Sequence, residues 1–259
     1  MSAQVSPTAE SVENALSIKG LTVHFGGLYA LRDVSFDVVQ GETFGIIGPN
    51  GAGKTTLLNA VSALVRTSGG SITFQSQDIT SVRTHRIAAL GVGRSFQLAE
   101  GFTHFSVWDY VRLGRAAVHR QGWLKPELTS AFDEGSRRAL DRFDLTHLKN
   151  TRMGLLPYGI RKMVDISRVM AGEPSLLLLD EPTSGLSREE RSEMTRHVQT
   201  LADEGRTVVV VDHDVGFISE VANNALALAY GETMCTGSLS DVLAHPGVMN
   251  SYLGIAKEV

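Results

Sequence analysis

The stretch that decides the fold of this chain is Gly48-Pro49-Asn50-Gly51-Ala52-Gly53-Lys54-Thr55, which fits the pattern G-x-x-x-x-G-K-[ST]. It follows an apolar run, Thr43 to Ile47, that predicts a strand, and it opens a helical pattern that extends to about Leu64. Glycines allow such a loop to curve until its backbone N–H groups and the positive end of the next helix face an anion. The sequence therefore predicts a strand, a phosphate-binding loop and a helix.

The residue types in the loop are suited to a triphosphate with bound Mg²⁺. Lys54 would place its ammonium between the β- and γ-phosphates, and Thr55 would give its hydroxyl to the metal ion. The residues of the loop and the helix start that we expect to bind the nucleotide are Gly48, Asn50, Gly51, Ala52, Gly53, Lys54, Thr55 and Thr56.

A second apolar run ends in two adjacent carboxylates. Leu176 to Leu179 lacks alternation and is too short for a helix, as expected of a strand buried on both faces of a parallel sheet, and Val208 to Val211 has the same character. Because parallel sheets bind ligands at the carboxyl ends of their strands, we expect Asp180 to hold the Mg²⁺ shell. Glu181 would polarise the water that attacks the γ-phosphate. By itself an apolar strand followed by acids is often only a solvated strand end, and the glycine-rich loop in the same chain favours the functional interpretation.

The remaining patterns predict the architecture around this site. Apolar alternation from Ile18 to Phe25 and from Val34 to Val38 indicates two antiparallel strands. Arg188 to Glu204 is a crossover helix, and about Phe105 to Ala171 has helical periodicity. We therefore expect an α/β fold: a P-loop NTPase (RecA-like) core with an N-terminal antiparallel β layer and an inserted α-helical lobe at about residues 100–171. Residues 1–14 would form a flexible tail and residues 15–259 a single nucleotide-binding domain.

Composition excludes some classes of protein. The formal net charge is -4, which lacks the basic excess of a nucleic-acid-binding protein, so no nucleic-acid partner is expected. Cys235 is the one cysteine and can form no internal disulfide, which fits a reducing cytosol and would also fit a secreted protein that is poor in cysteine. Met1 to Glu13 lacks the apolar core of a signal peptide, and no apolar run approaches the roughly 20 residues that span a bilayer. Any membrane role is expected to come through a partner.

From about Ile18 to Gly254 the chain resembles the ATP-binding-cassette (ABC) family, because further motifs stand in the family order. His24-Phe25-Gly26-Gly27 contains the aromatic residue on which the resemblance places adenine, and Arg94-Ser95-Phe96-Gln97 ends in the glutamine that contacts Mg²⁺ and joins the core to the helical lobe. His213 matches the histidine that contacts the γ-phosphate. The resemblance implies an ATPase with ATP and Mg²⁺ as cofactors. Taken singly, Phe25, Gln97 and His213 are more often ordinary core or surface residues.

Two further loops match family segments that act on the nucleotide of an opposite subunit. Leu156-Pro157-Tyr158-Gly159 stands at the family signature loop, and Ser184-Gly185-Leu186-Ser187 stands at the loop that crosses the dimer interface. The resemblance therefore implies a second ABC ATPase subunit as partner, with ATP between the two.

Within the family, the chain looks most like the ATPase subunits of uptake systems for branched-chain amino acids, urea, amides and similar small polar solutes. The segments that carry this likeness are Gly91 to Gln97 and Asp241 to Gly254. The likeness implies two transmembrane permease subunits, an extracytoplasmic solute-binding protein and a location at the cytoplasmic face of the inner or plasma membrane. A groove beside Gln97, lined by Phe102, Phe105 and Trp108, would receive a short permease helix; core packing is the alternative for each of these aromatic residues.

Three positions depart from the family pattern, and all three act in trans. Pro157 replaces a serine, Ile160 replaces a polar residue such as glutamine, and Ser187 replaces Asp or Asn. Proline supplies neither a hydroxyl nor an N–H. One hypothesis is an asymmetric heterodimer in which this chain's own nucleotide is hydrolysed and the partner's is mainly bound. The alternative is a homodimer or heterodimer in which the altered loop still closes, using Gly159 and the helix N-terminus.

Other functions remain as alternatives at this point. A soluble ABC-type switch without a transporter usually carries two fused cassettes, coiled-coil arms or basic extensions, and this chain shows none. An export subunit and a regulatory subunit that binds nucleotide without turnover are further alternatives. Glu181 and His213 argue against the last.

Overall fold

The computed structural model describes residues 13–96, 102–118 and 126–253. The first strand, β1, begins at Asn14, the last residue of the predicted tail, because Leu16 and Ile18 already enter the core. The other predicted tail positions up to residue 12 and the predicted metal contact Gln97 lie outside the described residues. Among those described, no helix is both long and apolar enough to cross a bilayer.

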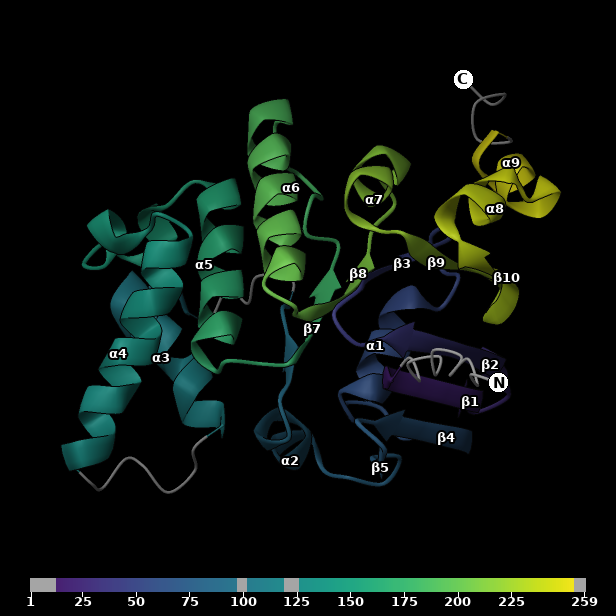
Figure 1. The fold of residues 1–259 in the computed structure, drawn as a ribbon, viewed down its shortest axis with the longest axis horizontal. Helices are drawn as coiled ribbons and strands as arrows, with labels where there is room; N and C mark the ends of the chain where they lie inside the picture. Colours follow the sequence, from purple (N-terminus) through teal and green to yellow (C-terminus); the bar gives the residue numbers. More distant parts are fainter. Residues whose placement is uncertain (1–12, 97–101, 119–125, 254–259) are drawn as a thin grey trace, which may run out of the picture.

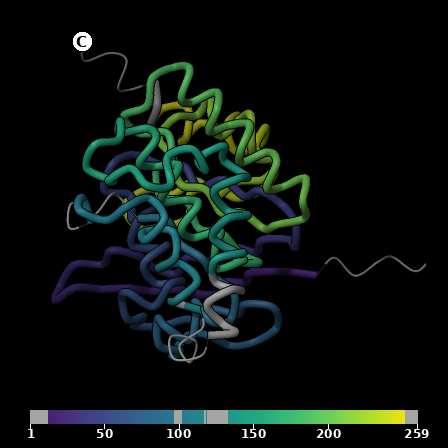
Figure 2. Tube along the Cα trace, turned by 90° about the vertical axis from the view of Figure 1, so that its left-hand side faces the viewer, coloured from purple at the N-terminus to yellow at the C-terminus, as the bar shows by residue number. Residues whose placement is uncertain are grey.

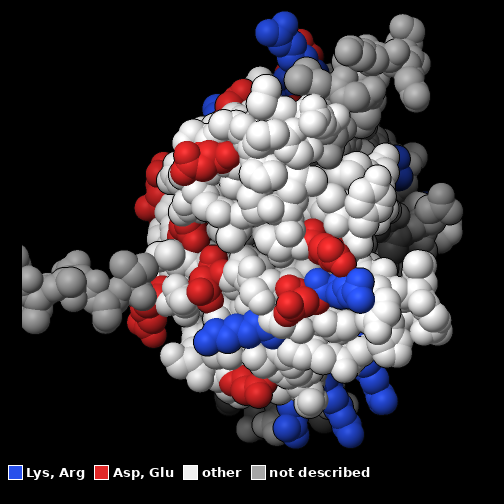
Figure 3. Space-filling view, turned by 90° about the vertical axis from the view of Figure 1, so that its right-hand side faces the viewer, with Lys and Arg blue, Asp and Glu red and all other residues white. Residues whose placement is uncertain are grey.

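The N-terminal layer is a four-stranded antiparallel sheet in the order β2-β1-β4-β5. Its strands are β1 (Asn14–Phe25), β2 (Leu28–Val39), β4 (Gly69–Phe74) and β5 (Gln77–Asp78). The alternation predicted this pairing, since Ile18 lies opposite Phe36 in the register and both side chains are buried. Figure 3 shows the side of the molecule that lies at the right in Figure 1, and both acidic and basic side chains are scattered over this side.

The central layer is a six-stranded sheet in the order β10-β9-β3-β8-β7-β6, parallel except for the edge strand β10. Its strands are β3 (Thr43–Ile47), β6 (Val92–Arg94), β7 (Leu176–Asp180), β8 (Thr207–Val211), β9 (Asn224–Ala229) and β10 (Glu232–Ser238). Successive residues of β7 enter different cores: Leu178 packs with the N-terminal layer and Leu179 with the helices. Burial on both faces explains why these strands are continuous apolar runs.

Helices cover the face of the central sheet opposite the N-terminal layer (Figure 1). They are α3 (Val107–Val118), α4 (Pro126–Arg142), α5 (Tyr158–Ala171), α6 (Arg188–Asp203), α7 (Val215–Val221), α8 (Leu239–Ala244) and α9 (Pro246–Leu253). The first three form the predicted lobe between β6 and β7, which stands in front of the rest of the chain in Figure 2. The short helix α2 (Thr84–Ala89) precedes β6, and 3₁₀ turns at Thr146–Leu148 and Met153–Leu155 connect α4 to α5.

The helix after the phosphate loop, α1 (Lys54–Val61), lies in the core between the two sheets, and it is shorter than predicted. Ser62 donates its hydroxyl to the Leu58 carbonyl, and Ala63 turns to a left-handed φ of 52°. The expected end near Leu64 was therefore wrong, because this turn ends the helix three residues earlier than the apolar pattern suggests.

Gly114 allows α3 to lie against α5 at backbone distance. A Cβ at this position would stand 1.6 Å from the Arg168 carbonyl oxygen, which no side-chain rotation relieves. We expect Gly114→Ala to lower the free energy of unfolding by about 1 to 3 kcal/mol, because the overlap outweighs the roughly 1 kcal/mol of helix propensity that alanine adds. Urea denaturation measures the change. Gly27→Ala is the matched control, because an added Cβ there meets nothing within 4 Å; an equal loss in both variants would contradict this packing.

Candidate nucleotide-binding site

The loop between β3 and α1 has a backbone that requires glycine. Gly51 and Gly53 have φ values of 79° and 102°, in the left-handed region. A Cβ on Gly53 would lie 2.6 Å from the Ala30 carbonyl oxygen, and one on Gly48 would lie 2.2 Å from the Leu228 carbonyl oxygen. Gly53 and Gly48 therefore let the loop pass close to β2 and β9, whereas Gly51 serves through its left-handed φ alone. The first turn of α1 begins at the end of the loop.

Lys54 is buried within this loop at 6% exposure. Its Nζ donates to the Gly48 carbonyl at 2.7 Å and to the Pro49 carbonyl at 3.0 Å. Burial lowers the pKa of this ammonium, and the nearby carboxylates of Glu181, Asp180 and Asp212 act in the opposite direction. A cation held at the centre of a curved backbone is suited to bind an anion.

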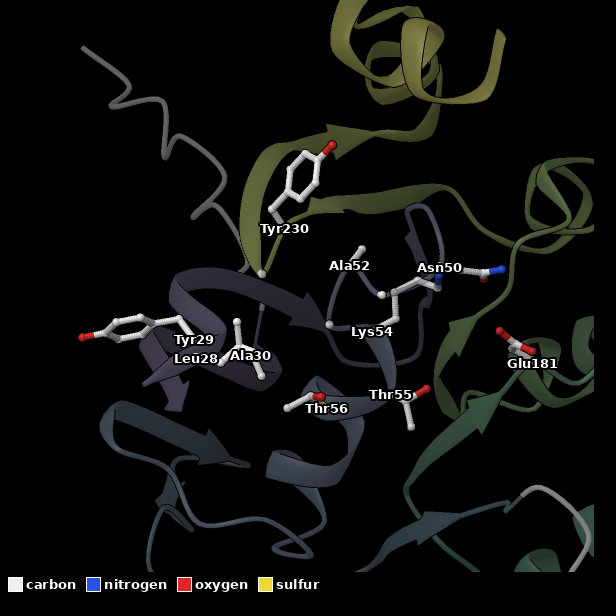
Figure 4. Close-up of a pocket in the computed structure, with 13 residues that line it drawn as sticks. Leu28, Tyr29, Ala30, Asn50, Ala52, Lys54, Thr55, Thr56, Glu181 and Tyr230 are labelled. Carbon is white, nitrogen blue, oxygen red and sulfur yellow. The ribbon is translucent and has the colours of Figure 1, made fainter. Parts of the chain in front are cut away.

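A cavity of about 530 Å³ opens over the loop. Residues 50–56 form its floor, residues 28–30 of β2 form one side, and Tyr230 and Gly231 of the β9–β10 turn form another. Glu181 faces the loop from across the cavity (Figure 4). The predicted loop residues from Asn50 to Thr56 are thus brought together with the predicted catalytic carboxylate, although 125 residues or more separate them in the chain.

Thr55, which lines this cavity, contacts Asp180 at the end of β7. The Thr55 hydroxyl donates to Asp180 Oδ1 at 3.3 Å. A hydroxyl and a carboxylate are the hard oxygen donors that Mg²⁺ prefers beside phosphate oxygens, so the two residues fit the predicted metal ion. Among the described residues, no group of three or more His, Cys, Asp or Glu side chains is placed so that it could hold a metal ion.

Glu181 is held in an uncommon backbone conformation. It has a left-handed φ of 48°, its N–H donates to the Val211 carbonyl at 2.8 Å, and its own carbonyl accepts from Lys162 Nζ at 2.6 Å. Non-glycine residues with positive φ cost energy and are found often at functional sites. This conformation turns the chain directly after Asp180, so that the two carboxylates face different parts of the site.

Four of the predicted nucleotide contacts lie outside the cavity lining: Gly48 and Asp180, which each contact a residue that lines it, and Phe25 and His213. Phe25, at the end of β1, is 55% exposed, and the aromatic residues that line the cavity are Tyr29 and Tyr230. The exposed His213 follows β8, with Nδ1 3.5 Å from Oδ1 of the fully buried Asp212. Contacts of Phe25 with adenine and of His213 with the γ-phosphate therefore stay predictions.

The signature and crossing loops pack against each other. The Tyr158 ring covers Gly185, where an added Cβ would lie 2.9 Å from ring Cε1, and an added Cβ on Gly159 would lie 2.2 Å from Glu190 Oε1. Ser187 caps α6: its hydroxyl accepts from the Glu190 N–H, and Glu190 bonds back to the Ser187 N–H. Because Ser, Asp and Asn are all good N-caps, the departure at Ser187 preserves the local role of this position.

The other two positions that depart from the family pattern, Pro157 and Ile160, lie at the start of α5. Pro157 stands at the N-cap of α5 and provides no side-chain hydrogen bond to the helix. Ile160 is partly buried and packs against the helical core, where a polar residue would need a partner. Ser184 is partly exposed, and Gly185 and Ser187 are exposed; their contact with a second subunit stays a prediction.

Of the three aromatic residues predicted to line a groove, Phe102 and Trp108 pack partly buried against the lobe core, and Phe105 is 38% exposed with its ring edge-on to Phe102. Their surroundings favour the core-packing alternative for Phe102 and Trp108. The groove itself stays a prediction.

Sequence reasoning assigned no role to Arg94 and Lys162. Arg94 forms a buried ion pair with Asp180, and Lys162 holds the carbonyls of Glu181 and Pro182. Arg94 begins the quoted motif that ends in Gln97, and Lys162 lies three residues after Gly159, the last residue of the quoted signature loop. A buried cation needs an anion or a carbonyl as its partner. A lysine or arginine within a motif that is expected to be buried could therefore have been predicted to contact the site.

The match to a family decides the identity of this site. Residues 31–184, more than half of the chain, match the model of the ABC transporter family. The chain belongs to the ABC transporter family. It is an ATP-binding ATPase subunit, and its α/β cassette fold is the one that the sequence predicted.

Relatives and solved structures agree with this membership. The chain is 31% identical over 253 residues to the high-affinity branched-chain amino acid transport ATP-binding protein LivG of Escherichia coli, with 93% of this chain and 98% of LivG covered. It is 31% identical over 256 residues to BraF of Pseudomonas aeruginosa, with the same coverage. Among solved structures, a nucleotide-free ATP-binding cassette of an ABC transporter superposes with a TM-score of 0.84 at 25% identity, covering 92% of this chain and 98% of that one. An ADP-bound cassette gives 0.83 at 25% identity, covering 93% and 99%.

Proposed function

We propose that this chain hydrolyses ATP to power the uptake of branched-chain amino acids or a related small polar solute. The observation that carries the proposal is its identity of 30 to 31%, over more than nine tenths of its length, to LivG and BraF proteins named for branched-chain amino acid transport. The site supports it, because the cavity joins the phosphate loop to a carboxylate at the end of β7.

The roles of the site residues follow from their positions. Lys54 and the loop amides bind the β- and γ-phosphates, and Thr55 with Asp180 holds Mg²⁺, which neutralises charge that develops on the phosphates. Glu181 orients and deprotonates the attacking water. Phe25 stacks on adenine, and His213 and Gln97 complete the γ-phosphate and metal contacts when the subunits close.

The chain works in a complex at the cytoplasmic face of the inner or plasma membrane. Its partners are a second ATP-binding subunit, two permease subunits that attach it to the membrane, and an extracytoplasmic solute-binding protein. The packed signature and crossing loops form the surface toward the second subunit's nucleotide, because the uncapped N-terminus of α5 offers N–H groups to a phosphate. Pro157 removes the side-chain donor at this surface, which supports a heterodimer whose two nucleotide sites differ.

Uptake by cells tests the proposal. Deleting the gene is expected to reduce uptake of radiolabelled leucine, isoleucine and valine, or of urea and short amides. The wild-type gene restores uptake and Glu181→Gln does not, although the variant protein is present at equal level. Glucose uptake serves as the control. Unchanged uptake of every one of these solutes in the deletion strain would contradict an importer of this class.

A further inference from the structure

We infer that Arg94 is a positioning residue that aims the Asp180 carboxylate at the metal ion. The inference rests on the metal-binding role proposed above for Asp180. Arg94 ends β6, the strand beside β7, and its register partner is Leu178, two residues before Asp180. A side chain from the adjacent strand is therefore in place to contact the carboxylate, and Arg94 is not among the residues that line the nucleotide cavity.

The two oxygens of Asp180 have separate partners. Arg94 Nη2 donates to Oδ2 at 3.1 Å, whereas Thr55 donates to Oδ1 at 3.3 Å. Both members of the ion pair are buried, with side chains 5% and 4% exposed. The guanidinium thus occupies Oδ2 and leaves Oδ1 on the side of Thr55, where the metal would bind.

The second branch of the guanidinium reaches the helix that carries Thr55. Arg94 Nη1 donates to Ser62 Oγ at 2.8 Å, and Ser62 donates in turn to the Leu58 carbonyl in α1. One planar group therefore joins the end of α1 to the end of β7. Because an arginine fork holds two acceptors in fixed relative positions, Arg94 sets the relation between the two proposed metal ligands.

The backbone of Arg94 is itself held by α5. Arg168 Nη2 donates to the Arg94 carbonyl at 3.4 Å, and the N–H of Phe96 donates to Asp165 at 3.0 Å. The guanidinium also lies 5.4 Å from the centre of the Phe96 ring. Arg94 thus has few conformations open to it.

Stability alone does not account for this arginine. A buried ion pair often contributes little net stability, because the cost of removing both charges from water offsets their attraction. Groups that orient metal ligands typically change metal affinity 10- to 100-fold when they are replaced. Positioning of Asp180 gives this buried charge a function that an apolar side chain could not serve.

Binding of Mn²⁺ as a spin probe to the purified chain with ADP tests the inference by electron paramagnetic resonance. Arg94→Met and Arg94→Lys are each expected to bind Mn²⁺ about tenfold more weakly than the wild type. Their affinity for ADP in EDTA should stay within about threefold, since Lys54 and the loop are unchanged. Ser62→Ala should weaken Mn²⁺ binding by a smaller factor, because Arg94 loses one of its two acceptors.

Arg94→Lys keeps the positive charge but not the planar guanidinium, so it distinguishes the positioning of Asp180 from a simple effect of charge. If Arg94 acted only as a cation that repels the metal ion, Arg94→Met would bind Mn²⁺ more tightly and Arg94→Lys would match the wild type; either result overturns the inference. If Arg94→Met does not fold, Arg94→Lys and Ser62→Ala carry the test. Arg112→Met is the control, because Arg112 pairs with Asp133 within the lobe, and it should match the wild type.

A further variant separates this inference from the proposal on which it rests. Asp180→Asn is expected to lose Mn²⁺ affinity in the ADP complex. Normal Mn²⁺ binding by Asp180→Asn would contradict the proposed role of Asp180. Loss in Asp180→Asn together with wild-type binding in both Arg94 variants would overturn the positioning role of Arg94 alone.

Discussion

Glu181→Gln is expected to bind ATP normally and to hydrolyse it roughly 10²- to 10⁴-fold more slowly, the usual contribution of a general base. Glu181 lines the cavity opposite the phosphate loop. Its left-handed φ of 48° turns the backbone directly after Asp180. Glutamine has nearly the same size and can still hydrogen-bond, but it cannot accept a proton at neutral pH. The substitution therefore removes the chemical step and preserves the shape of the site.

Phosphate release by the assembled complex, with ATP affinity measured in parallel, checks this result. The matched control is Glu189→Gln, an exposed acid in the first turn of α6, whose turnover should stay close to that of the wild type. ATP turnover above a tenth of the wild-type rate in Glu181→Gln would contradict the role of Glu181 as the general base. If the two nucleotide sites of the complex differ, changing the corresponding Glu of the second subunit alone should reduce ATP turnover much less than Glu181→Gln does. Equal losses of turnover from the two changes would contradict a complex with two unequal sites.

Lys54→Ala is expected to weaken ATP binding by about 2 to 3 kcal/mol, or roughly 30- to 150-fold, because hydrogen bonds to charged groups contribute about this much. Lys54 is buried, and it donates to the carbonyls of Gly48 and Pro49 within its own loop. An ATP phosphate with its formal charges is a stronger acceptor than these carbonyls. Loss of the ammonium leaves the loop amides as the main donors to the phosphates.

Calorimetric titration of the purified chain with ATP and Mg²⁺ measures this effect. Lys19→Ala, which removes an exposed lysine from β1, should leave the affinity unchanged. The melting temperature without nucleotide, measured alongside, shows whether Lys54→Ala remains folded at the temperature of the titration. ATP affinity within threefold of the wild type would contradict the role of Lys54 in phosphate binding.

Local pattern was enough to predict the elements that build the site. Gly48 and Gly53 leave no room for a side chain, since an added Cβ at either position would overlap a backbone carbonyl of another strand, and Gly51 has a left-handed φ. The apolar run Leu176 to Leu179 has the composition that burial on both faces imposes, and β7 is buried on both. Such features are local consequences of backbone geometry and of burial, and they can be read from adjacent residues.

Contacts between segments that are distant in the chain could not be predicted from local pattern. The pairing of Arg94 with Asp180 depends on which strand lies beside β7, and the packing of Tyr158 on Gly185 depends on how α5 meets the loop before α6. The end of α1 at Val61 depends on hydrogen bonds of Ser62, one of them with Arg94.

By itself, then, the sequence determined the fold class, the phosphate loop and the two carboxylates after β7, because short-range periodicity and glycine geometry specify them. Only the tertiary structure decided that Arg94 holds Asp180, that Lys162 holds the backbone of Glu181, and that Phe25 stands outside the cavity lining. The physical reason is that a buried charge chooses its partner among all groups that packing brings within about 3 Å, and packing is a property of the whole chain.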